Sequence, residues 1–237
     1  MKWFEQDPAA LTALEATLRD CYPTMHAFVE HGAVTVRGTY PVLDAGKEID
    51  RYSIAIKLPD RYPHDLPDVF ETGGRIPRTL DRHVFQSGAL CLGVREELWL
   101  TLRGDFSIVP LLEAPVRGFL IGNALVEEGE KWPDGDRSHG MSGILEFYEG
   151  YLGVKDPIVL LDFMYALVNE KVRGHWKCPC GSGAIIRNCH KDAVNALRSV
   201  PKAVIALSGM TIFEALKQRT ALLNSARSFM AGEATTE

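Results

Sequence analysis

Residues 51–58 read RYSIAIKL, and this stretch decides the fold class. Alternate positions from Tyr52 to Leu58 are apolar, and the positions between them are small or polar. This period of two is typical of a strand with one buried and one solvated face, as antiparallel sheets have. Residues 34–39 and 68–72 form further β-type runs on either side. The pattern therefore predicts an antiparallel meander.

Helical patterns flank the predicted meander on both sides. Asp7 and Pro8 supply an N-cap and a first-turn proline, and Leu11, Leu14 and Leu18 then repeat at helical spacing. Further helices are predicted over residues 106–126, 144–152, 156–174, 193–198 and 212–230. We therefore predict an α+β protein, with an N-terminal helix, the meander, following helices and a helical C-terminal extension.

The longest apolar stretch, residues 106–126, is interrupted by four residues that a helix in lipid would carry only at a high free-energy cost. These residues are Pro110, Glu113, Pro115 and Arg117. The stretch is therefore interpreted as a core helix, with a start that the prolines kink or displace.

Length, charge and composition narrow the class of protein. The 237 residues, 46% of them hydrophobic, suffice for one core of ordinary size and a smaller appended unit. A formal net charge of -5 gives no general reason to expect a nucleic-acid or membrane partner. The first ten residues lack a basic segment followed by an apolar run, so no secretory signal is predicted and a cytoplasmic location is expected.

Three of the five cysteines and one histidine lie within thirteen residues near the C-terminus. The sequence Cys178-Pro-Cys180-Gly-Ser-Gly is followed by Cys189-His190, a donor set that tetrahedral zinc accepts in structural sites. Any one of these cysteines alone could be a small buried apolar residue. Together they predict a structural zinc knuckle, because protein ligands fill all four positions and leave none open for a substrate. The cluster resembles the SEC-C motif, a short zinc module appended to many bacterial proteins.

Cys91 lies in the sequence GALCLG, and a lone cysteine between leucines is ordinarily core filler. Its context changes this interpretation. Several landmarks around Cys91 follow one another in a fixed order: Tyr62-Pro63, Pro67 after a strand, a long loop ending in Gly-x-x-Cys-Leu, then Trp99 and a helix. This order resembles the ubiquitin-conjugating enzymes over residues 1–152. We therefore expect a ubiquitin-conjugating-like domain over residues 1–153 and a helical extension over residues 154–237, which carries the zinc-binding motif at residues 174–192.

The resemblance implies that Cys91 is a nucleophile, which takes a C-terminal acyl group from another thioester and passes it to an amine. Thiol chemistry suits this task, because a thiolate is a strong nucleophile and its thioester reacts with amines. No organic cofactor is implied. Because the sequence has no ATP-binding glycine-rich loop, the activated acyl group has to come from elsewhere.

Three further residues are candidates at this site. The family carries a His-Pro-Asn triplet eight residues before its cysteine, where this chain has Asp81-Arg82-His83, so that His83 stands at the asparagine position. His83 is either an oxyanion donor or a structural loop histidine. His139 follows the core helix and could lower the pKa of Cys91 or receive the amine proton. Asp105 is either an orienting acid for the incoming amine or a helix N-cap.

The departure from the asparagine pattern and the SEC-C motif both point to the bacterial conjugating-enzyme-like proteins of CBASS antiphage operons. That resemblance implies a protein acyl donor, such as the C-terminus of a cyclic-nucleotide synthase, and a protein or small-amine acceptor. Two alternatives stay open. One is a non-catalytic binding module of the same fold that recruits partners through the zinc motif. The other is a thiol hydrolase using Cys91, His139 and Asp105.

Overall fold

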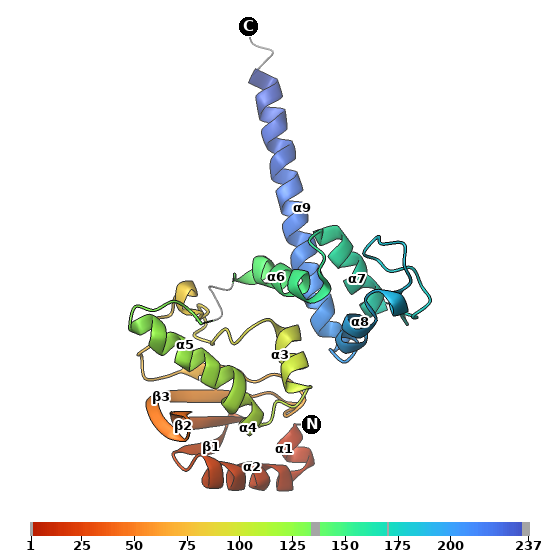
Figure 1. Ribbon diagram of the computed structural model, residues 1–237. Helices are drawn as coiled ribbons and strands as arrows, with labels where there is room; N and C mark the ends of the chain where they lie inside the picture. The colour runs from red at the N-terminus through yellow and green to blue at the C-terminus, as the bar shows by residue number, and fades with distance from the viewer. Residues whose placement is uncertain (1, 134–137, 170, 234–237) are drawn as a thin grey trace. The chain divides into compact units, whose positions relative to one another are not determined.

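The computed structural model describes residues 2–133, 138–169 and 171–233 (Figure 1). The chain divides into two compact units. Unit 1 comprises Met1–Gly93 and Thr101–Arg137, and unit 2 comprises Val94–Leu100 and Ser138–Glu237. The predicted domain boundary after residue 153 stays a prediction.

Unit 1 is built on a four-stranded antiparallel sheet with the strand order β1-β2-β3-β4. The strands are β1 (Met25–Glu30), β2 (Ala33–Asp44), β3 (Lys47–Leu58) and β4 (Asp68–Glu71). The predicted alternation in β3 is confirmed, because its apolar positions from Tyr52 to Leu58 are buried. Val36 of β2 lies opposite Ile56 in the register, and both side chains are fully buried. One face of the sheet thus forms the core, as the α+β prediction required.

Helices complete the core of unit 1. The chain opens with α1 (Trp3–Gln6) and α2 (Pro8–Cys21), and the Asp7 carboxylate caps α2 by accepting a hydrogen bond from the Ala9 N–H at 3.1 Å. Helices α4 (Ile108–Leu111) and α5 (Arg117–Glu127) cross the buried face of the sheet, and α2 lies beside β1 (Figure 1). Tyr40 of β2 donates a hydrogen bond to the Leu112 carbonyl at 3.1 Å. The sheet is thereby joined to the helical layer through polar groups as well as apolar packing.

The predicted kink near the prolines takes the form of a widened turn. A π-helical turn, η2 (Leu112–Val116), contains Pro115 and joins α4 to α5. Proline has no N–H to donate to the preceding turn, so a wider turn accommodates it. Within the described residues, Ile108–Glu127 is the one single helix long and apolar enough to cross a membrane. Leu111, Leu112 and Leu120 are fully buried in the core of unit 1, which agrees with the core-helix interpretation.

Unit 2 is helical and has its own apolar core. Its helices are α6 (Gly140–Leu152), α7 (Pro157–Asn169), α8 (Lys191–Leu197) and α9 (Lys202–Glu233), with a short turn η3 (Ile186–Asn188). Helix α3 (Arg95–Leu102) contributes its first residues. Gly209 of α9 faces α7, and a Cβ there would be in ordinary van der Waals contact with the Met164 sulfur, at 3.5 Å. Buried side chains including Leu160, Phe163 and Leu197 fill the space between these helices.

One carboxylate lies in the core of unit 2. Glu96 is fully buried, and its Oε1 accepts a hydrogen bond from the Tyr148 hydroxyl at 3.0 Å. Ser208 is near enough to stabilise the ionised Glu96 carboxylate, which lowers the pKa of Glu96. Among the described residues, however, Oε2 of Glu96 has no hydrogen-bond partner. Burial raises the pKa of Glu96 above its usual 4.5. The protonated carboxyl is therefore the form that suits this core.

We expect Glu96→Gln to stabilise the protein at neutral pH by about 1–3 kcal/mol, the usual cost of an unmade hydrogen bond on a buried polar group. The raised pKa means that folding takes up a proton. Wild-type stability therefore falls as pH rises from about 4.5 through the pKa of folded Glu96. The amide removes this pH dependence, so the two proteins converge at low pH. Urea unfolding of both proteins across this pH range checks the prediction, and equal stability at neutral pH would contradict it.

Candidate functional site

A short hairpin places Cys91 beside His83 in unit 1. Val84 and Leu90 form an antiparallel bridge, and the Cys91 N–H donates to the His83 carbonyl at 2.8 Å. The Leu90 N–H donates to the carbonyl of Val69 in β4 at 2.8 Å, which attaches the hairpin to the sheet. As a result, the Cys91 Sγ and a ring nitrogen of His83 lie within 4.8 Å of each other. Two residues that the sequence separates by a loop are thus brought together.

His83 has an unusual backbone conformation. It ends a 3₁₀ turn, η1 (Leu80–Arg82), with a φ of 53°, in the left-handed region. Histidine is one of the few residue types enriched there, along with asparagine and aspartate. Its imidazole is buried, with 7% of its surface exposed. A strained, buried and titratable residue beside a thiol is a common arrangement at functional sites.

Helix α5 and the segment after it hold the turn that carries His83. Arg82 donates hydrogen bonds to the Asn123 side-chain oxygen at 2.8 Å and to the Asn123 carbonyl at 3.0 Å. The Trp132 indole meets the His83 ring edge-on, with ring centroids 4.7 Å apart. Its Nε1–H donates to the Asp81 carbonyl at 3.3 Å. The two residues before His83 and the His83 ring itself are therefore held in place by α5 and Trp132.

The surroundings of Cys91 favour its neutral thiol. The residue is half-buried, and burial raises the pKa of its thiol above the usual value, although the Gly93 N–H opposes this shift by donating to the sulfur. A thiol in this state needs a base to become a nucleophile near neutral pH. Within unit 1, the His83 imidazole, within 4.8 Å of the sulfur, is the candidate for that base.

The two remaining predicted site residues, Asp105 and His139, each lie close to the start of a helix. Asp105 is exposed and its carboxylate accepts a hydrogen bond from the Ser107 N–H at 3.0 Å, just before α4. The N-cap of α4 is Ser107, so this bond is a local turn before the helix and Asp105 is not the helix cap. His139 is the N-cap residue of α6 and belongs to unit 2. A role for either residue at Cys91 stays a prediction.

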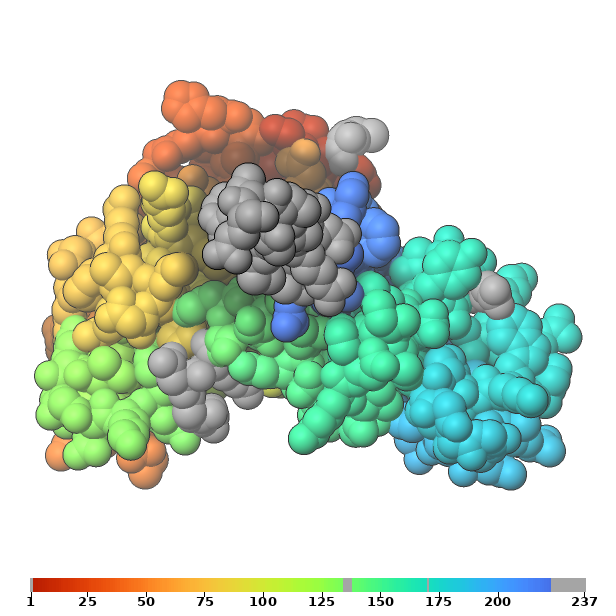
Figure 2. All heavy atoms as spheres, turned by 90° about the horizontal axis from the view of Figure 1, so that it is seen from above, coloured from red at the N-terminus to blue at the C-terminus, as the bar shows by residue number. Residues whose placement is uncertain are grey.

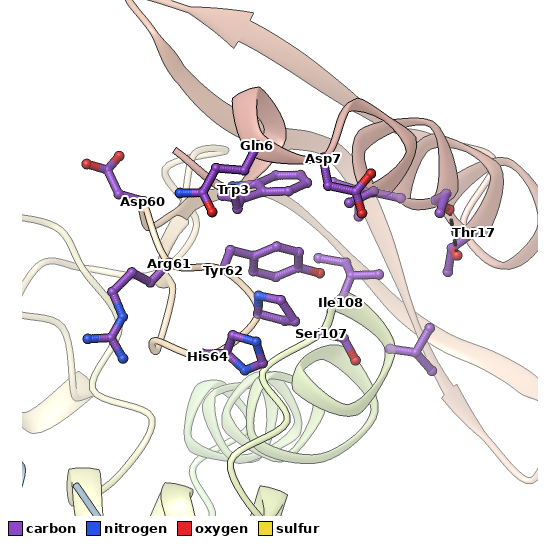
Figure 3. A pocket seen from close by; sticks show the side chains of 15 residues that line it. Trp3, Gln6, Asp7, Thr17, Asp60, Arg61, Tyr62, His64, Ser107 and Ile108 are labelled. Carbon is purple, nitrogen blue, oxygen red and sulfur yellow. Dashed lines mark hydrogen bonds between the residues drawn. The ribbon is translucent and has the colours of Figure 1, made fainter. Parts of the chain in front are cut away.

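Unit 1 also carries an open groove of about 640 Å³. It lies between the N-terminal helices, the loop after β3 and the start of α4 (Figure 3). Figure 3 shows Trp3 and Gln6 on one side, with Tyr62, His64 and Ser107 on the other. Neither Cys91 nor His83 lines this groove. It is therefore a surface feature separate from the Cys91 site.

The predicted metal ligands converge in unit 2. One donor atom from each of Cys178, Cys180, Cys189 and His190 lies within 4.8 Å of every other donor. Donors bound tetrahedrally to zinc at about 2.3 Å stand roughly 3.8 Å apart, so the cluster fits one ion. The His190 Nδ1 is 3.2 Å from the Cys178 sulfur and 3.1 Å from the Cys189 sulfur. This group could hold a metal ion.

Local structure explains how these donors meet. Lys177 and Ile185 form an antiparallel bridge, and the Cys178 N–H donates to the Ala184 carbonyl at 2.9 Å. Gly181 and Gly183, between the cysteines, both have a φ of 76°, a conformation that glycine adopts without strain. The segment lies at the surface of unit 2, where its cyan and blue atoms are visible (Figure 2).

The second nitrogen of His190 points away from the thiols. His190 Nε2 lies 2.7 Å from the carbonyl of Leu152, the last residue of α6. Since a carbonyl only accepts hydrogen bonds, Nε2 carries the proton and Nδ1 presents a lone pair to the cluster. Metal-binding histidines usually make such a bond, which fixes their tautomer and orientation. The cluster is thereby coupled to the end of α6.

Comparison with protein-family models and with solved structures finds no match. Trp132, Gly122 and Asn123 were missed by the sequence analysis, although they support the turn at His83. The sequence offered one weak indication of their role. Trp132 is a single tryptophan within the charged stretch EEGEKWPDGD, and an aromatic side chain in such a stretch is expected to pack against another part of the protein.

Proposed function

We propose that this protein is a ubiquitin-conjugating-like acyl carrier that forms a thioester at Cys91 and transfers the acyl group to an amine. The single observation that carries the proposal is the placement of the Cys91 thiol beside the buried His83 imidazole. The order of elements also supports it: a helix, a four-stranded antiparallel meander, the segment with Cys91 and then further helices. That order is the one the family resemblance implies.

The proposed chemistry needs one nucleophile and one proton carrier. The Cys91 sulfur bonds to the acyl carbon of a donor thioester as His83 takes the thiol proton, and the donor thiolate leaves with the electron pair and receives that proton. An amine then attacks the acyl carbon of the Cys91 thioester, the carbon–sulfur bond breaks, and Cys91 leaves with the electron pair. His83 takes the proton that the amine loses and returns it to the Cys91 thiolate. In each step, while it carries that proton, the imidazole can donate a hydrogen bond to the tetrahedral oxyanion.

The proposed partners are proteins. The acyl donor is the activated C-terminus of a protein, in the bacterial antiphage setting a cyclic-nucleotide synthase, and the acceptor is a lysine or a small amine. The cytoplasm provides the reducing conditions that a free Cys91 thiol and a cysteine-bound metal both need. Neither nucleic acid nor a membrane is part of this proposal.

Zinc is the metal that we propose for the Cys/His cluster in unit 2. Three thiolates and one imidazole are the usual donors of a structural zinc site, and no fifth position is needed for a substrate. The bond between His190 and Leu152 suits this assignment, because it orients the imidazole toward the thiols. When bound, zinc would join the knuckle to the helical core of unit 2.

A second candidate function is a non-catalytic binding module. The half-buried state and raised pKa of Cys91 favour it, because a packed thiol is ordinarily inert. The groove of about 640 Å³ in unit 1 would then be the surface that seats a partner protein. The two functions differ in one property, the reactivity of Cys91 in the folded protein.

A donor-independent experiment tests the acyl-carrier proposal. Zinc-saturated protein is incubated with a small-molecule thioester of a short peptide, and peptide mapping by mass spectrometry locates the acyl group. We expect it on Cys91, released by added thiol and transferred to added lysine. Cys91→Ala should abolish this labelling, whereas Cys21→Ala, which changes an exposed cysteine, should retain it. Labelling of Cys21 without Cys91 would favour the binding module.

A further inference from the structure

Trp132 contacts the turn that carries His83 at two separate points. Its indole ring meets the imidazole at 90°, with centroids 4.7 Å apart, and its Nε1–H bonds to the Asp81 carbonyl at 3.3 Å. Phe119 of α5 packs behind it, at a centroid distance of 6.0 Å. A ring held on three sides restricts the orientations that the neighbouring imidazole can adopt.

The Trp132 indole packs directly against Gly122 of α5, where the absence of a side chain leaves room for the ring. A Cβ on Gly122 would lie 2.2 Å from Cζ3 and 2.5 Å from Cε3 of the Trp132 indole. Any side chain there would force the rigid indole away from α5. Glycine lowers the stability of a helix interior, so its presence in α5 requires a local reason. Gly118, one turn earlier on the same helix, has nothing within 4 Å of its own Cβ position.

We infer that Trp132 is a positioning residue that, seated on Gly122, holds the His83 imidazole toward the Cys91 thiol. This inference rests on the proposed function, because it requires that His83 acts on Cys91. The rest of the turn is anchored independently, since Arg82 is bound to Asn123 and lies 3.6 Å from the Glu127 carboxylate. Loss of the indole should therefore leave the turn in place and remove the ring contact that Trp132 makes with the imidazole.

Alkylation of Cys91 by iodoacetamide measures this role without any knowledge of the natural donor. The Cys91 sulfur bonds to the reagent's carbon, the carbon–iodine bond breaks, iodide leaves with the electron pair, and the thiol proton passes to His83 and then to water. Peptide mapping reports the rate at Cys91 separately from those of the other four cysteines. At pH 7 we expect His83→Gln to slow this reaction about tenfold, because less thiolate forms without the base.

Matched variants of α5 test the positioning. Gly122→Ala and Trp132→Ala should each slow alkylation of Cys91 to nearly the rate of His83→Gln, whereas Gly118→Ala should retain the wild-type rate. The double variant His83→Gln/Trp132→Ala should be no slower than His83→Gln alone, because the tryptophan acts through the histidine. In NMR spectra, the His83 imidazole signals should lose the ring-current shift from Trp132 in Gly122→Ala and keep it in Gly118→Ala.

Three results would overturn the inference. A wild-type rate in Trp132→Ala, with His83→Gln slow, would remove the positioning role and leave the proposed function standing. A further slowing of the double variant would show that Trp132 acts independently of His83. A wild-type rate in His83→Gln would remove the base from the proposed function, and the inference with it. Gly122→Ala and Trp132→Ala both remove the packing of the indole on α5, one by a change in the helix and the other by a change in the tryptophan. If one variant misfolds locally, the other still tests the inference.

Discussion

Removal of zinc is expected to unfold much of unit 2 and leave unit 1 folded. Structural zinc supplies about 10 kcal/mol or more to the smallest zinc modules, which do not fold without it. Unit 2 also has an apolar core that includes Leu160, Phe163 and Leu197. We therefore expect chelation to lower its free energy of unfolding by roughly 5 kcal/mol, a part of the value for an isolated module.

Hydrogen exchange with and without a chelator measures this loss unit by unit. Amides of α8 and the end of α6 should lose protection, because His190 joins the cluster to the Leu152 carbonyl. Amides of β2 and β3 should keep theirs. Cys189→Ser should behave like the chelated protein, whereas Cys21→Ser, at an exposed cysteine of unit 1, should behave like wild type. Protein that contains no zinc as isolated, or that exchanges alike in both conditions, would contradict the zinc assignment.

His83→Gln is expected to slow acyl transfer about 100-fold, a typical contribution of a positioned general base. This effect is larger than the tenfold loss expected for simple alkylation, because acyl transfer also needs a proton returned to the departing thiolate, whereas iodide leaves without one. Glutamine retains a donor of similar reach, so the variant loses mainly the proton acceptor. Single-turnover transfer from a small-molecule thioester to Cys91, measured from pH 6 to pH 9, checks this prediction.

The pH dependence separates a base from a structural residue. Burial raises the pKa of Cys91, so the variant without a base should recover activity as the pH rises and the thiolate forms unaided. The deficit should therefore be largest near neutral pH and shrink in alkali. A deficit that is constant with pH would indicate that His83 supports the loop and takes no proton.

The sequence predicted those parts of the fold whose residues follow a simple local pattern. The alternation from Tyr52 to Leu58 identified β3, and the Asp7-Pro8 pair identified the start of α2. The Cys/His spacing identified the four donors that the structure brings together, because the ligands of a knuckle lie within one short segment. Structural features that depend on residues close together in the sequence could therefore be predicted from the sequence alone.

Elements without a local pattern were missed for identifiable reasons. Met25 is the one buried position of β1, so this edge strand shows no alternation. Helix α3 places the fully buried Glu96 where an apolar residue is expected, which obscures its helical period. The pairing of His83 with Trp132 joins positions 49 residues apart, and no spacing rule links them. Such contacts depend on the tertiary structure.

The central claim is that Cys91 carries an acyl group, and mass spectrometry of the protein recovered from its native cells tests it most directly. Wild type and Cys91→Ser are compared under non-reducing and reducing conditions. We expect a protein adduct on wild type that added thiol releases, and a stable ester on the serine variant whose mass identifies the donor. A Cys91 that carries nothing and resists alkylation in the folded protein would contradict the claim and leave the binding module in its place.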